Sequence, residues 1–212
     1  MFTDLVLAKD NEKEFIDLAE KLKTNGLCFI YSFKTREDFL KKNEQIKKLQ
    51  QKTKIRLFSG LIADSKNIIK AKKLTNLVIY KSTGNDRQVI EKSKQSIVFG
   101  LETIAVRDSM HYRNSGLNQI LCKLANKNNI IIGFSFSSLL NTDGKLRSQI
   151  LGRMMQNIRL CRKYKVKTAI ASFAEKPYDM RPCPDLKSVL ISLGMHPAEA
   201  SDSLENMYKR LS

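Results

Sequence analysis

Short apolar segments alternate with longer amphipathic stretches along nearly the whole chain. The strand-like segments lie at 2–8, 27–33, 54–61, 76–80, 96–102, 130–136 and 168–173. Stretches with helical periodicity lie between and after them, at 11–25, 35–51, 64–74, 85–95, 115–129, 143–165, 184–193 and 197–211. Such alternation predicts a parallel sheet whose strands are joined by right-handed helical crossovers.

Two architectures share this alternation, an open doubly wound sheet and a barrel of the triosephosphate isomerase (TIM) type. A full barrel has eight strands and about 250 residues, whereas this chain has 212 and is helical in pattern after Leu186. We therefore predict a single domain, 1–212, with a TIM-barrel-like, mostly parallel α/β fold. We expect about seven strands, an irregular or missing last strand and extra C-terminal helices.

Several kinds of site are missing from the sequence. The four cysteines form no C-x-x-C pair and the two histidines are far apart, which excludes a zinc ribbon and a disulfide framework. No glycine-rich phosphate loop and no G-x-S-x-G nucleophile elbow occurs. No apolar stretch is long enough to span a membrane, and the first residues do not resemble a secretory signal. We expect a cytoplasmic protein with reduced cysteines.

Two carboxylates stand in or after predicted strands, where barrel enzymes place catalytic groups. Asp4 lies within the first strand and Glu102 at the end of the fifth. Two isolated carboxylates are too few for metal-assisted hydrolysis, and Asp4 is as readily a hydrogen-bonded structural group. We predict no catalytic residue and no metal ligand on this chain.

Positive charge is the strongest functional signal. The 38 Lys and Arg residues exceed the 21 Asp and Glu residues by 17, which favours nucleic acid as a partner over an acidic membrane surface. Between Arg107 and Lys167, 12 basic residues face only two acids, and seven of the 11 arginines lie between Arg107 and Arg181. The planar guanidinium group matches phosphate, so this skew indicates an RNA-binding or DNA-binding surface.

The candidate RNA-binding residues lie in loops after predicted strands and on predicted helices. They are Arg87, Arg107, Arg113, Lys123, Arg153, Arg159, Lys163, Lys176 and Arg181. We expect Lys145, Arg153, Arg159 and Lys163 to lie on the outer side of the helix at 143–165. In a parallel barrel the loops after the strands open on one face, so we expect their cations to gather there, with Arg107 close to Arg181. Tyr112 and Tyr178 are the only loop aromatics suited to stack on bases.

Four motifs show a family resemblance. They read RDSMHYRNSGLNQILCKLA at 107–125, IGFSFSSLL at 132–140, LGRMMQNIRLCRKYK at 151–165 and YDMR at 178–181. Together with Asp185-Leu186 and Leu193-Gly194-Met195 they resemble the ribonuclease P protein component 3 family, the archaeal counterpart of the eukaryotic 30 kDa subunit. Residues 1–100 match the family in pattern only.

The resemblance implies a barrel-like fold and a role in ribonuclease P, the endoribonuclease that removes the 5′ leader from precursor tRNA. It implies a non-catalytic protein subunit, because in that family the RNA subunit carries the chemistry and holds Mg²⁺. The partners it implies are ribonuclease P RNA, ribonuclease P protein component 2, the other proteins of the particle and the precursor tRNA. The absence of a long C-terminal tail favours an archaeal source.

Two other functions remain open at this point. The family fold resembles metal-dependent polymerase-and-histidinol-phosphatase phosphoesterases, so a free-standing metal-dependent phosphoesterase is the main alternative. Those enzymes carry histidines after the first strand, where this chain has Asp4-Leu5-Val6. The third possibility is a basic scaffold that binds no defined RNA.

Overall fold

Seven parallel strands form one sheet in the part of the chain that the computed structural model describes, residues 1–92 and 97–211. The strands are β1 (Thr3–Val6), β2 (Gly26–Ser32), β3 (Arg56–Ile62), β4 (Val78–Lys81), β5 (Ile97–Phe99), β6 (Ile131–Ser135) and β7 (Thr168–Ala171). Each strand pairs with the next one along the chain. The predicted TIM-barrel-like fold is confirmed.

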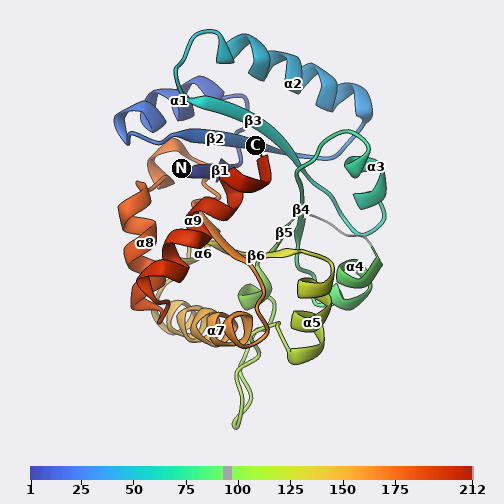
Figure 1. Ribbon diagram of the computed structural model, residues 1–212, viewed down its shortest axis with the longest axis vertical. Coiled ribbons are helices and arrows are strands. Elements are labelled where there is room, and N and C mark those ends of the chain that lie inside the picture. The colour runs from blue at the N-terminus through green and yellow to red at the C-terminus, as the bar shows by residue number, and fades with distance from the viewer. Residues whose placement is uncertain (93–96, 212) are drawn as a thin grey trace.

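Helices follow most of the strands and surround the sheet (Figure 1). They are α1 (Glu12–Lys21), α2 (Arg36–Gln50), α3 (Ile68–Lys72), α4 (Asp86–Lys92), α5 (Gln119–Lys127), α6 (Ser137–Leu140), α7 (Gly144–Lys163), α8 (Cys183–Ser192) and α9 (Pro197–Leu211). Two 3₁₀ turns, η1 (Leu101–Thr103) and η2 (Pro177–Asp179), lie in the loops. The extra C-terminal helices that the sequence predicts are α8 and α9.

Local sequence signals explain several element boundaries. Thr35 caps α2 as predicted, since its hydroxyl accepts the backbone N–H of Asp38 at 3.1 Å. The fifth strand ends at Phe99 and not at Glu102, because Gly100 has a φ of 76° and turns the chain into η1. The predicted end of the fourth helix at Gln95 and the start of the fifth strand at Ser96 lie outside the described residues.

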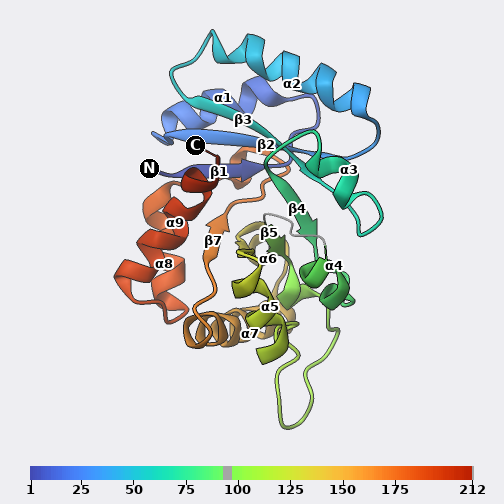
Figure 2. The same ribbon diagram turned by 45° about the vertical axis from the view of Figure 1, so that its right-hand side comes forward.

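The barrel is nearly closed, with an open seam between β1 and β7. The sequence predicts an irregular or missing last strand, and among the described residues no eighth strand is present. Helix α9 packs on both seam strands in its place (Figure 2). Met207 of α9 is buried with side chains of the barrel interior. The Thr168 hydroxyl lies 2.5 Å from that of Ser203, and Asn206 donates a side-chain hydrogen bond to the Thr168 carbonyl.

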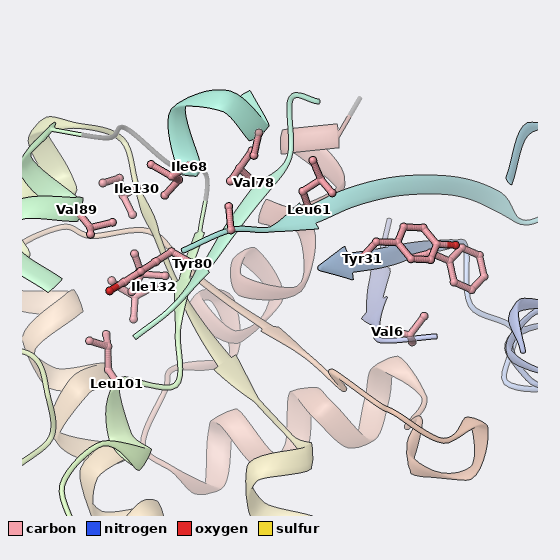
Figure 3. Packing of buried hydrophobic residues seen from close by; sticks show 14 of the residues in the cluster. Val6, Tyr31, Leu61, Ile68, Val78, Tyr80, Val89, Leu101, Ile130 and Ile132 are labelled. Carbon is pink, nitrogen blue, oxygen red and sulfur yellow. The ribbon is translucent and has the colours of Figure 1, made fainter. Parts of the chain in front are cut away.

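Three apolar layers hold the elements together. One fills the inside of the barrel, where the rings of Phe99 and Phe173 stack at 4.3 Å. A second lies between the strands and the helices α1 to α5 and also includes Cys161 of α7. Figure 3 shows Tyr80 surrounded by side chains from strands and helices in this layer. A third joins β6 and β7 to α7, α8 and α9. These layers pack the strands against the helices and thereby position the loops between them.

The cysteines are free thiols, and Cys28, Cys122 and Cys161 are buried. Burial raises the pKa of the Cys122 thiol to about 11. Among the described helices, none combines the length and the apolar character needed to cross a membrane.

Candidate nucleic-acid interface

The loops after the strands open at one end of the barrel, because all seven described strands run in the same direction. We call this end, formed by those loops and the first turns of the helices after them, the strand-end face. Seven basic side chains of its β4 to β7 portion are exposed: Lys81, Arg87, Arg107, Arg113, Lys145, Arg147 and Lys176. Arg181 also lies there and is half-buried. The proximity of Arg107 to Arg181 stays a prediction.

The loop 104–118 projects from the barrel between η1 and α5 (Figures 1 and 2). It returns to the barrel at Gly116, whose φ of 76° favours glycine and whose added Cβ would lie 2.4 Å from the Leu101 carbonyl oxygen. This backbone cannot continue a helix, so the predicted helix start at Ser115 is wrong. Helix α5 begins at Gln119, capped by Asn118, whose side-chain oxygen accepts the Leu121 N–H at 2.9 Å.

Arg153 is fully buried, which makes its prediction as an outward-facing RNA contact wrong. Its guanidinium donates to Asp108 Oδ1 at 2.8 Å and to the carbonyls of Glu102 and Ala105 at 3.0 and 2.7 Å. Helix α7 is buried on more than its apolar stripe because η1 and the loop 104–118 lie against it. Arg153 therefore binds protein groups, not phosphate.

Asp108 is the acid that this arginine neutralises. Partial burial would raise its pKa, but hydrogen bonds from Arg153 and from the Asn114 N–H hold that pKa below its usual range. The Asn114 side chain donates to the Arg107 carbonyl at 2.8 Å. The only acid in the loop 104–118 is thereby engaged inside the protein.

Arg113 is exposed but rests on α7. Its guanidinium lies against Gly152 and donates to the Gly152 carbonyl at 3.2 Å. Arg181 is held similarly, over the Phe136 ring at 5.4 Å and by hydrogen bonds to the carbonyls of Tyr178 and Met180. Both side chains are held against the protein surface by these contacts, and the neighbouring Tyr178 is 86% exposed.

The other predicted cations are divided between the two ends of the barrel. Lys163 ends α7, and β7 begins shortly after it, so Lys163 lies at the end opposite the strand-end face. Arg159 is one helical turn earlier, and Lys123 is in the middle of α5. All three are exposed, but the structure does not bring them to the loops that carry Arg107 and Lys176.

Ion pairs neutralise a different set of cations. Lys9 pairs with Glu175 at 2.8 Å, Lys42 with Asp10, and Arg162 with Glu199 at 2.6 Å. Within the described residues, none of the predicted cations other than Arg153 lies within 4 Å of an acidic group. These eight side chains are available to an anionic ligand: Arg87, Arg107, Arg113, Lys123, Arg159, Lys163, Lys176 and Arg181.

The two carboxylates considered from the sequence are buried. Asp4 accepts hydrogen bonds from the Ser172 N–H at 2.7 Å and from the Ser172 hydroxyl at 2.6 Å, so it is a structural group. Burial outweighs these bonds and raises the pKa of Asp4 to about 6. Across the described residues, no cluster of three or more His, Cys, Asp and Glu side chains could hold a metal ion.

The sequence alone did not identify Gly152 or Asp108 as functional residues. The one signal for Gly152 was its place inside the longest predicted helix, where glycine is unfavourable and usually has a packing reason. Nothing in the sequence paired Asp108 with Arg153, because that contact joins residues 45 positions apart.

The family model described as RNase P subunit p30 matches residues 1–211. The chain belongs to this family. The p30 match extends the resemblance seen in the motifs of the second half to nearly the whole chain.

Relatives of this p30-family chain are archaeal proteins named ribonuclease P protein component 3. The Methanocaldococcus jannaschii protein is 27% identical over 205 residues, which cover 93% of this chain and 85% of that protein. The Thermococcus kodakarensis protein is 32% identical over 169 residues, covering 79% of this chain and 74% of that protein. The predicted family is confirmed.

Solved structures share the fold of this p30-family chain. A chain in the cryo-EM structure of archaeal ribonuclease P with mature tRNA superposes with a TM-score of 0.78 at 23% identity, over 98% of this chain and 89% of that one. A Xaa-Pro dipeptidase superposes with a TM-score of 0.64 at 9% identity, over 99% of this chain and 74% of that one. Proteins with different functions thus share this barrel, so the function of each depends on the residues at its surface and not on the fold.

Proposed function

We propose that this p30-family chain is an RNA-binding protein subunit of ribonuclease P that supports removal of the 5′ leader from precursor tRNA in the cytoplasm. The RNA subunit carries the chemistry and holds Mg²⁺, and the protein binds no cofactor of its own. The observation that supports this is the set of eight predicted cations that, within the described residues, have no acidic group within 4 Å, seven of them exposed. Cations of this kind bind the phosphates of a nucleic acid and position it.

The strand-end face is the proposed main contact for RNA. It carries Arg107, Arg113 and Lys176 together with the half-buried Arg181, and most of these are arginines. Arginine forms bidentate hydrogen bonds with phosphate and retains its charge at any working pH. The proposed protein partners are ribonuclease P protein component 2 and the remaining proteins of the particle, as the family resemblance implies.

Reconstitution of the particle tests this function. RNA binding and precursor tRNA cleavage are measured for the wild-type protein and for Arg107→Ala and Lys176→Ala, with Lys48→Ala as the matched control. Lys48 is an exposed lysine near the end of α2, away from the strand-end face. We expect the first two variants to bind RNA more weakly and to need more Mg²⁺ for cleavage, because Mg²⁺ screens the same phosphates.

The results separate the three functions. An equal loss in Lys48→Ala would indicate a basic scaffold without a defined RNA surface. Turnover of precursor tRNA or of phosphoesters by the protein alone with Mg²⁺, Mn²⁺ or Zn²⁺ would support the phosphoesterase instead. A loss that added Mg²⁺ does not restore would show that the residue replaced is not a phosphate contact.

A further inference from the structure

One face of α7 holds both sides of the loop 104–118. Arg153 binds Asp108 from the first half of the loop, and Asn157 donates to the Ser115 carbonyl at 2.9 Å in the second half. Between them, Arg113 lies on Gly152. The loop is thus fixed to the helix by contacts on both of its sides.

Because Gly152 has no side chain, it leaves a space on α7 in which Arg113 packs and which the side chain of any other residue would fill. We call this space the seat of Arg113. It is buried in the middle of α7, and an added Cβ would lie 3.0 Å from Nε and 3.1 Å from Cζ of Arg113. These distances are shorter than an ordinary van der Waals contact, so the Arg113 guanidinium would have to shift by a few tenths of an ångström. A glycine in the middle of a helix is less favourable than an alanine. At this position the space left by the missing side chain is filled by the Arg113 guanidinium from the loop.

The outer part of the loop is exposed and combines apolar and cationic side chains. Val106, Met110 and Tyr112 are 83%, 92% and 66% exposed, and Arg107 and His111 are exposed beside them. Asp108 contributes no free negative charge, since Arg153 binds it. This combination suits contact with RNA, where an arginine binds phosphate and an aromatic ring stacks on an unpaired base.

We propose that Gly152 is a positioning residue, whose bare backbone seats Arg113 and thereby holds the loop 104–118 so that Arg107 and Tyr112 meet the RNA. The Asp108–Arg153 pair anchors the same loop from the other side. The proposal rests on the RNA-binding function above, and it assigns to a residue without a side chain the task of setting the geometry of that contact.

Gly152→Ala tests the seat with little risk to folding, because alanine favours the helix and only a surface side chain must move. The control is Ser148→Ala, which also places an alanine in α7 but at an exposed position that bonds only within the helix. We expect a melting temperature equal to or above that of the wild type. We expect faster trypsin cleavage after Arg107 and Arg113, and RNA binding weaker by roughly tenfold, the size of one lost charged hydrogen bond.

A double-mutant cycle shows whether Gly152 acts through Arg113. In the Arg113→Ala background the seat is empty, so adding Gly152→Ala should weaken RNA binding no further. Additive losses would overturn the proposal, as would unchanged trypsin cleavage in Gly152→Ala. Faster trypsin cleavage with wild-type RNA affinity would also overturn it where Arg107→Ala does weaken RNA binding. If Arg107→Ala leaves RNA binding intact while trypsin still cleaves Gly152→Ala faster than the wild type, the proposed RNA-binding function fails. The placement of Arg113 by Gly152 then still stands.

Discussion

Glu102 lies in η1 with its side chain buried, and burial raises its pKa to about 7. Within the described residues its Oε1 has no hydrogen-bond partner. Arg153 lies close by, but its guanidinium donates to the backbone carbonyl of Glu102. Its positive charge therefore does not pair with the Glu102 carboxylate. At neutral pH this residue therefore opposes folding, because burial disfavours the ionised form of a carboxylate that has one oxygen without a hydrogen-bond partner.

The pH dependence of stability follows from this shift. The folded pKa of Glu102, about 7, exceeds the ordinary value of 4.5, so the folded protein retains a proton that the unfolded chain releases between these values. The contribution of Glu102 therefore becomes less favourable as the pH rises from about 4.5 to 7, by about 3 kcal/mol in total. Glu102→Gln should raise the free energy of unfolding at pH 8 by about 1 to 3 kcal/mol and change it little at pH 4. Urea denaturation at both pH values measures this, and an equal effect at the two would contradict it.

At the scale of elements, the seam between β1 and β7 is closed by backbone hydrogen bonds beyond the end of β7, by side chains and by a helix. Past the end of β7, the Phe173 N–H donates to the Leu5 carbonyl at 2.8 Å, and Ala174 forms a bridge with Val6. Asp4 adds two hydrogen bonds from Ser172 across the same seam. Toward the other end of β7, α9 packs over the gap and carries Met207 into the interior.

Asp4 should therefore stabilise the seam without taking part in chemistry. Asp4→Ala leaves the buried N–H and hydroxyl of Ser172 without that acceptor and should lower the free energy of unfolding by about 2 to 3 kcal/mol. Asp4→Asn keeps an oxygen for the Ser172 N–H and removes the ionisable group, so it should be at least as stable as the wild type at pH 7. Thermal or urea unfolding distinguishes the two, and cleavage activity of folded Asp4→Asn should equal that of the wild type.

At the scale of the molecule, the positive charge is distributed unevenly between paired and free side chains. Lys9 and Lys42, in the first third of the barrel, are neutralised by acids, whereas the predicted cations of the later loops are not. Lys163 and Arg159 provide a separate basic region toward the opposite end of the barrel. RNA bound to the strand-end face would contact the unpaired cations of the later loops, and it would not contact Lys163 and Arg159.

The salt dependence of RNA binding measures how many of these charges meet phosphates. Each neutralised phosphate contributes about −0.7 to −0.9 to the slope of log K against log salt. Arg107→Ala and Lys176→Ala should each make the slope shallower by roughly one unit, with little change in folding because exposed charges contribute little stability. Lys163→Ala should leave the slope unchanged. A shallower slope for Lys163→Ala as well would show that RNA contacts both ends of the barrel.

Local patterns in the sequence determined the order and type of the elements. Apolar runs at strand spacing, helical stripes and caps such as Thr35 depend on neighbouring residues, so the parallel barrel and the family motifs could be predicted without coordinates. The excess of basic residues likewise predicted a surface for nucleic acid. These features require only interactions within a few residues of one another or a sum over the chain.

Only the tertiary structure decided which polar residues are free. Arg153 has the same local surroundings as an exposed helical arginine, yet contacts with Glu102, Ala105 and Asp108 bury it. Helix α5 starts at Gln119 because Gly116 packs on Leu101, and α9 takes the place of an eighth strand because its apolar face fits the seam. Each of these outcomes depends on groups that are distant along the chain or on how whole elements pack, and the periodicity of a single segment carries no information about which distant groups it will meet.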